Sequence, residues 1–273
     1  MQLKEILIKN NFRFNKRYGQ NFITDVNLLN KIVELSGVNT GDTVIEIGAG
    51  GGTLTRALCE KAKRVIAYEV DNNLQPVLKE TLADFDNARV IFKDVMKVST
   101  DEIEKEVGGE YKVVANLPYY ITTPILMKFI EEGKNLTSIS VTVQEEVADR
   151  LCAKEGTSDY GSITASIDAV GTAKKVLKIG RNNFYPVPNV DSALVRIDID
   201  RNKYDIKDPE KFKAVVRCAF SSRRKTFVNN LMQSFKMDRE EAENLIKSIG
   251  KDVLIRGETL STEDFITLSE YIK

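Results

Sequence analysis

The sequence of 273 residues contains no histidine and no tryptophan, and only three cysteines. Without histidine the chain has no Ser-His or Cys-His nucleophile pair, no imidazole general base and no His-ligated zinc or iron site. Cys59, Cys152 and Cys218 lie far apart and form no C-x-x-C pair, which argues against a zinc site made of cysteines alone. Widely spaced cysteines are typical of reduced thiols, so we expect a cytoplasmic protein without a metal.

Long apolar runs are also missing. The N-terminus carries only the short run Ile6–Ile8 before charged residues return, which is not the pattern of a signal peptide. No stretch approaches the roughly 18 apolar residues of a membrane span. With 42% hydrophobic and 29% charged residues, the chain has the composition of a globular protein, and its length suits one large domain with a small appendage.

The net charge of zero, from 40 basic and 40 acidic residues, conceals an uneven distribution. Residues 211–236 contain seven basic residues and no acid, and residues 1–18 contain five basic residues against Glu5. Two basic blocks in a neutral protein indicate a docking surface for a polyanion. Solvated helix faces are the alternative interpretation of the same pattern.

Short apolar runs rich in β-branched residues alternate with helical patterns in the middle of the chain. This alternation predicts an α/β fold with a largely parallel sheet covered by helices. The predicted helices are 53–63, 73–82 and 124–132. The predicted strands, about seven in all, are 43–47, 65–69, 89–92, 112–116, 138–143, 173–179 and 191–198.

The pattern changes after Asp200. Asp208 followed by Pro209, then Asp238, then Ser261 with Asp264 three residues on, are typical helix starts. We therefore expect two domains, 1–200 with a basic N-terminal arm and a small all-helical domain at 201–273.

A glycine-rich loop follows the first of the central predicted strands. Gly48, Gly50 and the neighbouring glycines stand between a strand and a helix, where they allow a tight turn and close approach of a ligand. Glu69 ends the next strand, 21 residues after Gly48, where a carboxylate accepts hydrogen bonds from ribose hydroxyls. The alternative, a glycine turn that only packs, is disfavoured by this order of strand, loop, helix, strand and acid.

The type of nucleoside cofactor follows from two further positions. Thr53 stands where the dinucleotide fingerprint has Gly or Ala, and the chain has no G-x-x-x-x-G-K-[ST] loop for a nucleoside triphosphate. S-adenosylmethionine needs no pyrophosphate cradle and is the predicted cofactor. Asp94, at the end of the third strand, is the candidate acceptor for the adenine amino group, with a turn or helix cap as the alternative role.

The segment Asn116-Leu117-Pro118-Tyr119 follows the fourth strand, at the carboxyl edge where open α/β sheets bind ligands. The Asn116 side-chain oxygen and the Pro118 carbonyl can both accept from an exocyclic NH2, and Tyr119 can stack on a base. Two acceptors localise the lone pair of an aromatic amine, so alignment with a sulfonium methyl can supply most of the rate. A plain turn built on Asn and Pro is the alternative.

These segments together resemble those of the ribosomal small-subunit RNA adenine N6,N6-dimethyltransferases (the KsgA type). The resemblance covers nearly the whole chain. Its motifs are KRYGQNF at 16–22, the glycine loop, NLPYYITTP at 116–124, QEEVADRL at 144–151, YGS at 160–162, NFYPVPNVDSA at 183–193 and AFSSRRKTFVNNL at 219–231.

The resemblance implies a Rossmann-like S-adenosylmethionine-dependent methyltransferase fold with a mixed sheet and a helical C-terminal RNA-binding domain. It implies that Asn21 and Ile23 line the cofactor pocket, and that Phe184 faces Tyr119 across the target adenine. Packing is the alternative role of Phe184. The implied substrate is a pair of adjacent adenosines in a hairpin loop near the 3′ end of small-subunit RNA, each receiving two methyl groups during ribosome biogenesis.

Positive side chains in both basic blocks are the predicted RNA contacts. Arg13, Lys16 and Arg17 belong to the N-terminal arm, and Arg223, Arg224 and Lys225 are expected at the start of a helix. Such contacts bind phosphates and make binding salt-sensitive. The expected partner is small-subunit RNA or an assembling small subunit, bound by a monomer.

Three other functions fit parts of the sequence. Asn21–Thr24 is compatible with the related large-subunit methylases of macrolide resistance, although Leu117, Pro124 and the segment 184–193 favour the small-subunit group. A non-catalytic assembly factor is disfavoured by the intact segment 116–119 and by Glu69, because a protein that only binds RNA has no need of amine acceptors. A nicotinamide oxidoreductase is disfavoured by Thr53 and by the absence of a hydride-transfer acid/base pair.

Overall fold

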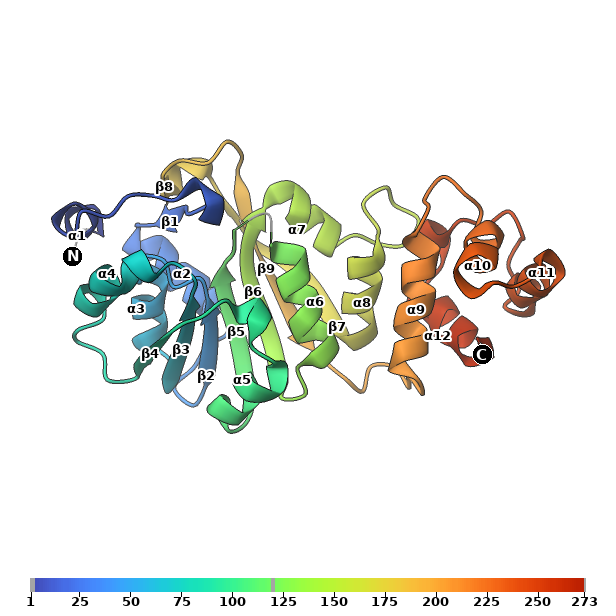
Figure 1. Ribbon diagram of the computed structural model, residues 1–273, viewed down its shortest axis with the longest axis horizontal. Coiled ribbons are helices and arrows are strands. Elements are labelled where there is room, and N and C mark those ends of the chain that lie inside the picture. The colour runs from blue at the N-terminus through green and yellow to red at the C-terminus, as the bar shows by residue number, and fades with distance from the viewer. Residues whose placement is uncertain (1–2, 119–120, 273) are drawn as a thin grey trace. The chain divides into compact units, whose positions relative to one another are not determined.

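The computed structural model describes residues 3–118 and 121–272, and of Lys16 only the backbone (Figure 1). The chain divides into two compact units. The first contains Met1–Ala148 and Ala173–Ile199, and the second contains Asp149–Thr172 and Asp200–Lys273.

The first unit is built on a seven-stranded sheet with the order β4-β3-β2-β5-β6-β9-β7. Its strands are β2 (Thr43–Ile47), β3 (Arg64–Glu69), β4 (Ala88–Phe92), β5 (Tyr111–Asn116), β6 (Leu136–Gln144), β7 (Gly171–Ile179) and β9 (Ser192–Ile199). The pairs from β4 to β6 are parallel, and β9 is antiparallel to β6. The predicted mixed α/β sheet is therefore confirmed.

The strand order places the binding edge. The chain passes from β2 to β3 on one side and later returns to β5 on the other side of β2. Such a reversal leaves a crevice outside the carboxyl ends of the strands, because the connecting segments diverge there. The glycine loop after β2 and the Asn116 segment after β5 both leave the sheet at this crevice.

Helices lie on both sides of this sheet (Figure 1). They are α1 (Leu3–Lys9), α2 (Val26–Leu35), α3 (Thr53–Cys59), α4 (Gln75–Thr81), α5 (Thr100–Val107), α6 (Thr122–Glu132) and α7 (Glu145–Leu151). Leu29 and Ile32 of α2 pack with Leu58 of α3 and Val44 of β2 in one buried cluster. The helix predicted over 53–63 ends earlier, at Cys59, where the chain turns into β3.

A second, two-stranded sheet joins segments that are far apart in the sequence. In it β1 (Phe22–Ile23) pairs antiparallel with β8 (Phe184–Tyr185), so that Ile23 lies opposite Phe184. Two-residue strands have no periodicity, so the sequence pattern did not predict them. This pairing holds the end of the N-terminal arm beside the glycine loop, where the hydroxyl of Thr53 donates to the Ile23 carbonyl at 2.7 Å.

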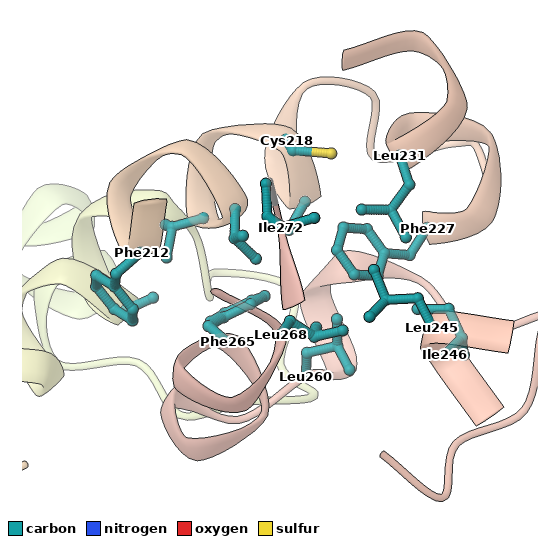
Figure 2. Close-up of a cluster of buried hydrophobic side chains, with 14 of the residues drawn as sticks. Phe212, Cys218, Phe227, Leu231, Leu245, Ile246, Leu260, Phe265, Leu268 and Ile272 are labelled. Carbon is teal, nitrogen blue, oxygen red and sulfur yellow. The ribbon is translucent and has the colours of Figure 1, made fainter. Parts of the chain in front are cut away.

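The second unit is helical, with α8 (Ser162–Val170), α9 (Pro209–Phe220), α10 (Phe227–Phe235), α11 (Arg239–Ser248) and α12 (Thr262–Tyr271). The predicted helix starts at Asp208, Asp238 and Ser261 are confirmed, since each side chain accepts from backbone N–H groups of the first turn. Figure 2 shows its core, in which apolar side chains from α9 to α12 meet.

The second unit is larger than the domain predicted at 201–273. It also takes in 149–172, including α8, because Tyr160, Ala165 and Ala169 are buried in the same core as Phe212 and Phe265. The chain therefore leaves the first unit after Ala148, within α7, and returns to it at Ala173, within β7. Residues 149–172 lie between two predicted strands in the sequence, which is why the pattern assigned them to the sheet domain.

Candidate active site

A pocket opens at the carboxyl edge of β2, β3 and β5. Its empty space, part of it open to solvent, is about 750 Å³. The pocket is lined by 18–23 of the arm, Leu29, Glu46, 48–51, Thr53, Leu54, Glu69, Val70 and 116–118. Asn21, Ile23, Gly48, Gly50, Glu69 and Asn116, all predicted from the sequence, thus lie together.

The glycine loop is shaped by close contacts as well as by its backbone. Gly50 has a φ of +55°, and a Cβ there would lie 2.7 Å from the ring of Phe22. Its N–H donates to the Glu69 carboxylate at 2.8 Å. A side chain at Gly50 would therefore displace both the arm and the acid that we expect to bind ribose.

Glu69 is held by backbone donors at both oxygens. One oxygen accepts from the N–H of Gly50, and the other accepts from the N–H groups of Val70 and Asp71 at 2.9 and 2.8 Å. The side chain is 5% exposed, and burial raises its pKa. Carboxylate oxygens have further lone pairs, so Glu69 is a fixed acceptor that can still receive hydroxyl donors.

Glu46 is a pocket residue that the sequence analysis did not select. It is 1% exposed, and its polar neighbour is the Thr55 hydroxyl, although no hydrogen bond of normal geometry reaches either of its oxygens from the described residues. Burial raises its pKa to about 8, although the Thr55 hydroxyl lowers it. Such a carboxyl group is costly unless a ligand partners it. Its position near the carboxyl end of β2, two residues before Gly48, was the available signal.

Asn116 is oriented by the arm. Its Nδ2 donates to the Asn21 carbonyl at 2.8 Å. Because that carbonyl can only accept, the bond fixes the amide so that its oxygen is the group left for a ligand. Asn21 in turn donates from Nδ2 to the carbonyl of Gly19 at 3.1 Å.

The rest of the predicted amine-binding segment is partly described. Pro118 lines the pocket, and its carbonyl accepts from the N–H of Ile121 at 3.2 Å and from the hydroxyl of Thr122 at 3.3 Å. Both bonds are long, so an amine would compete with weak donors at this oxygen. Tyr119 lies outside the described residues.

Asp94 does not line the pocket. Its Oδ1 accepts from the N–H of Met96 at 3.0 Å and caps the short 3-10 helix Val95–Lys97. The alternative role considered for Asp94, a turn or helix cap, is therefore present. Its predicted role toward adenine stays a prediction.

Phe184 is 3% exposed and belongs to the same buried cluster as Ile23 and Leu29. The packing role considered as an alternative is thus what the structure displays. Its backbone pairing with Ile23 places it next to a pocket-lining residue, so its stacking on the target base also stays a prediction.

The predicted RNA contacts differ in their surroundings. Arg13, Arg17, Arg224 and Lys225 have exposed side chains. Arg223 and its two neighbours do not begin a helix as expected, because they form the turn before α10, whose N-cap is Thr226. Arg223 also donates to the carbonyls of Ser158 and Tyr160 at 2.6 and 3.2 Å and pairs with Glu258.

Within 3–118 and 121–272, no group of three or more acidic residues or cysteines could hold a metal ion. No helix there has the length and apolar character needed to cross a membrane.

The mixed seven-stranded sheet, with a pocket at the carboxyl ends of its parallel strands, is the fold of the S-adenosylmethionine-dependent methyltransferases. The sequence matches the family described as Ribosomal RNA adenine dimethylase over residues 11–273. The chain belongs to this family, and it is an enzyme whose cofactor is S-adenosylmethionine.

Two similar relatives support the assignment to this family. Ribosomal RNA small subunit methyltransferase A of Clostridioides difficile (strain 630) is 44% identical over 272 residues, covering 98% of this chain and 94% of the relative. The protein of the same name from Bacillus cytotoxicus is 44% identical over 274 residues, covering 97% and 94%.

Two solved structures share the fold. A dimethyladenosine transferase from Plasmodium falciparum aligns with a TM-score of 0.73 and 24% identity, covering 90% of this chain and 95% of that one. The 23S rRNA methyltransferase ErmE aligns with a TM-score of 0.69 and 25% identity, covering 92% and 99%.

Proposed function

We propose that this enzyme dimethylates the N6 amines of two adjacent adenosines in a hairpin loop near the 3′ end of small-subunit ribosomal RNA. The observation that carries the proposal is the pocket at the sheet edge, where Glu69 and the amide of Asn116 are held by backbone groups 2.8 Å away. The small subunit is favoured over the large because the full-length relatives named for it are 44% identical, against 25% for the 23S enzyme.

The pocket residues fit S-adenosylmethionine. Glu69 is the acceptor for the ribose hydroxyls, and the turn of Gly48 and Gly50 admits the cofactor close to the main chain. The enclosed carboxyl group of Glu46, which has the Thr55 hydroxyl beside it, is suited to a cationic group, and the cofactor carries an ammonium. Asn21, Ile23 and Asn116 form the wall nearest the substrate amine, and Asp94 is proposed for the adenine amino group.

When bound, the cofactor supplies a methyl group on a sulfonium centre. The chain contributes two acceptors, the Asn116 oxygen and the Pro118 carbonyl, for the hydrogens of the substrate amine. These bonds direct the nitrogen lone pair toward the methyl donor. Tyr119 and Phe184 are proposed to replace the stacking that a loop adenosine loses on entering the pocket. No histidine is needed, because a sulfonium methyl group requires no strong base.

The second unit is proposed to bind RNA through the turn 223–225, and the arm through Arg13, Lys16 and Arg17. We propose that the enzyme acts as a monomer in the cytoplasm, on small-subunit RNA or an assembling small subunit. The domain roles follow the predicted division at about residue 200, with 149–172 added to the helical part.

The test is transfer of labelled methyl groups from S-adenosylmethionine to small ribosomal subunits that lack the modification. We expect four methyl groups on two neighbouring adenosines, detected by nucleoside analysis. Transfer to large-subunit RNA alone would select the macrolide-resistance type of activity. Binding of subunits without any transfer would select the non-catalytic assembly factor.

Glu46 gives a prediction about pH. Its pKa of about 8 in the folded chain lies above the ordinary value of 4.5, so the folded state retains a proton that the unfolded state loses. The contribution to stability is therefore fully present below about pH 4.5 and is lost as the pH rises through 8. In Glu46→Gln the ligand-free enzyme should lose less stability over this interval, measured as Tm against pH.

The same carboxyl group should respond to the cofactor. A bound ammonium favours the ionised form of Glu46, so cofactor binding near pH 7 should release about one proton. Calorimetry in buffers of different ionisation enthalpy measures this number, which should fall toward zero in Glu46→Gln. Equal proton release in both proteins would contradict the assignment.

The turn before α10 gives a prediction about RNA. Arg224→Ala/Lys225→Ala should weaken RNA binding and reduce the slope of log K against log salt by about 1.4–1.8, since each phosphate contact contributes about 0.7–0.9. Cofactor affinity should not change. The matched control is Arg239→Ala/Lys247→Ala, which removes two cations that pair with Glu243 on α11. A slope equal to that of the wild type would contradict the prediction.

A further inference from the structure

The end of the N-terminal arm is a compact turn closed by Gln20. Within it, Asn15 accepts the N–H of Arg17 at its side-chain oxygen and the N–H of Tyr18 at its carbonyl, both at 3.0 Å. The Oε1 of Gln20 accepts the N–H of Asn15 at 3.0 Å. The oxygen of the Gln20 amide therefore stabilises the turn.

The NH2 group of the same amide binds a residue that follows β3 in the first unit. The Nε2 of Gln20 donates to Oδ2 of Asp71 at 2.8 Å. Asp71 is 2% exposed, and its Oδ1 accepts from the N–H and from the Nδ2 of Asn73 at 3.1 and 2.9 Å. Asn73 therefore fixes the Asp71 carboxylate independently of the arm. The hydrogen bond from Gln20 to this carboxylate is charge-assisted.

This contact continues into the cofactor pocket on both sides. Asp71 donates its N–H to Glu69, and Glu69 accepts the N–H of Gly50. On the arm, the residues next to Gln20 line the pocket from Tyr18 to Ile23. A chain of hydrogen bonds therefore runs from the arm through Gln20, Asp71 and Glu69 to the glycine loop.

We propose that Gln20 and Asp71 are a positioning pair that fastens the N-terminal arm against the cofactor pocket. The inference rests on the proposed assignment of this pocket to the cofactor. The pair holds Asn21, whose carbonyl orients Asn116, in register with Glu69 across the pocket. Breaking it loosens the wall of the pocket that carries Asn21, which lowers cofactor affinity and weakens the orientation of Asn116.

The sharpest variant is Gln20→Glu. It preserves the size of the side chain and an acceptor for the N–H of Asn15, but it turns the contact with Asp71 into a repulsion between carboxylates. Gln20→Ala removes both contacts. The matched control is Glu80→Ala, which removes the contacts that Lys9 and Asn10 make from the arm to α4, outside the pocket.

We expect Gln20→Glu to raise the Kd for S-adenosylmethionine, measured by calorimetry, about tenfold. The KM for the cofactor should rise similarly, and by a larger factor than kcat at saturating cofactor falls. Glu80→Ala should leave cofactor affinity unchanged. In a double-mutant cycle of Gln20→Ala with Asp71→Asn, the double variant should lose less cofactor binding free energy than the two single variants together. The reason is that each single variant already breaks the same Gln20–Asp71 hydrogen bond.

The outcomes separate the two proposals. A wild-type enzyme that does not bind S-adenosylmethionine would overturn the cofactor site and the positioning pair with it. If the wild type binds and Gln20→Glu binds equally well, only the positioning pair is overturned. A fall in kcat at unchanged KM, or additive costs in the cycle, would also overturn it.

Discussion

Asn116→Ala should reduce methyl transfer about 100- to 1000-fold at saturating cofactor and RNA, which is the usual cost of removing one preorganised polar group from a reacting centre. The Asn116 oxygen is oriented because Nδ2 is bound to the Asn21 carbonyl at 2.8 Å. Alanine removes the acceptor and frees the arm carbonyl at the same time. Single-turnover transfer to unmethylated subunits measures the loss, and filter binding should show RNA affinity near that of the wild type.

A matched control for this variant is Asn87→Ala. Asn87 also donates from Nδ2 to backbone carbonyls, those of Cys59 and Ala62, but it does not line the pocket. Its loss should lower Tm and leave the transfer rate unchanged. A rate for Asn116→Ala within a few-fold of the wild type would remove Asn116 from the catalytic step.

Glu69→Gln should weaken cofactor binding about 100-fold, or about 2.7 kcal/mol. The carboxylate accepts three backbone N–H groups and is proposed to accept the ribose hydroxyls as well. The amide has one acceptor oxygen and directs an NH2 group at backbone donors, so both the loop and the ribose contacts suffer. Calorimetry with S-adenosylmethionine measures the change in Kd.

Glu104→Gln is the control for Glu69→Gln. Glu104 is a second buried glutamate that accepts a backbone N–H, that of Asn135 at 2.9 Å, and it lies outside the pocket. Its substitution should lower Tm without changing cofactor affinity. An equal loss of affinity in the two variants would mean that Glu69→Gln acts through general destabilisation.

The central strands of the sheet were predictable because they are buried on both faces and therefore have apolar runs in the sequence. Val44 and Ile45 of β2, for example, are fully buried. The helix starts at Asp208, Asp238 and Ser261 were predictable because capping is a local interaction within a few residues. Site residues at strand ends, such as Glu69 and Asn116, were predictable for a related reason, since parallel strands bring their carboxyl ends to one edge.

Other features depend on contacts between distant segments. Glu46 has the sequence context of an ordinary strand residue, and only the packing around it shows that its carboxyl group is enclosed. Arg223 looks like its neighbour Arg224, yet it donates to carbonyls more than 60 positions away in the chain. The assignment of 149–172 to the helical core likewise required knowing what Ala165 packs against.

The sequence by itself determined the class of fold, the carboxyl edge that carries the site, and a chemistry in which hydrogen-bond acceptors replace histidine. These follow from periodicity, strand ends and residue types, which are local properties. The tertiary structure decided which polar groups are already engaged: Gln20 with Asp71, Asn116 with Asn21, and Arg223 with 158–160. The physical reason is that burial and hydrogen bonding depend on segments brought together only by folding, so a residue's type states what it can bind and not what it does bind.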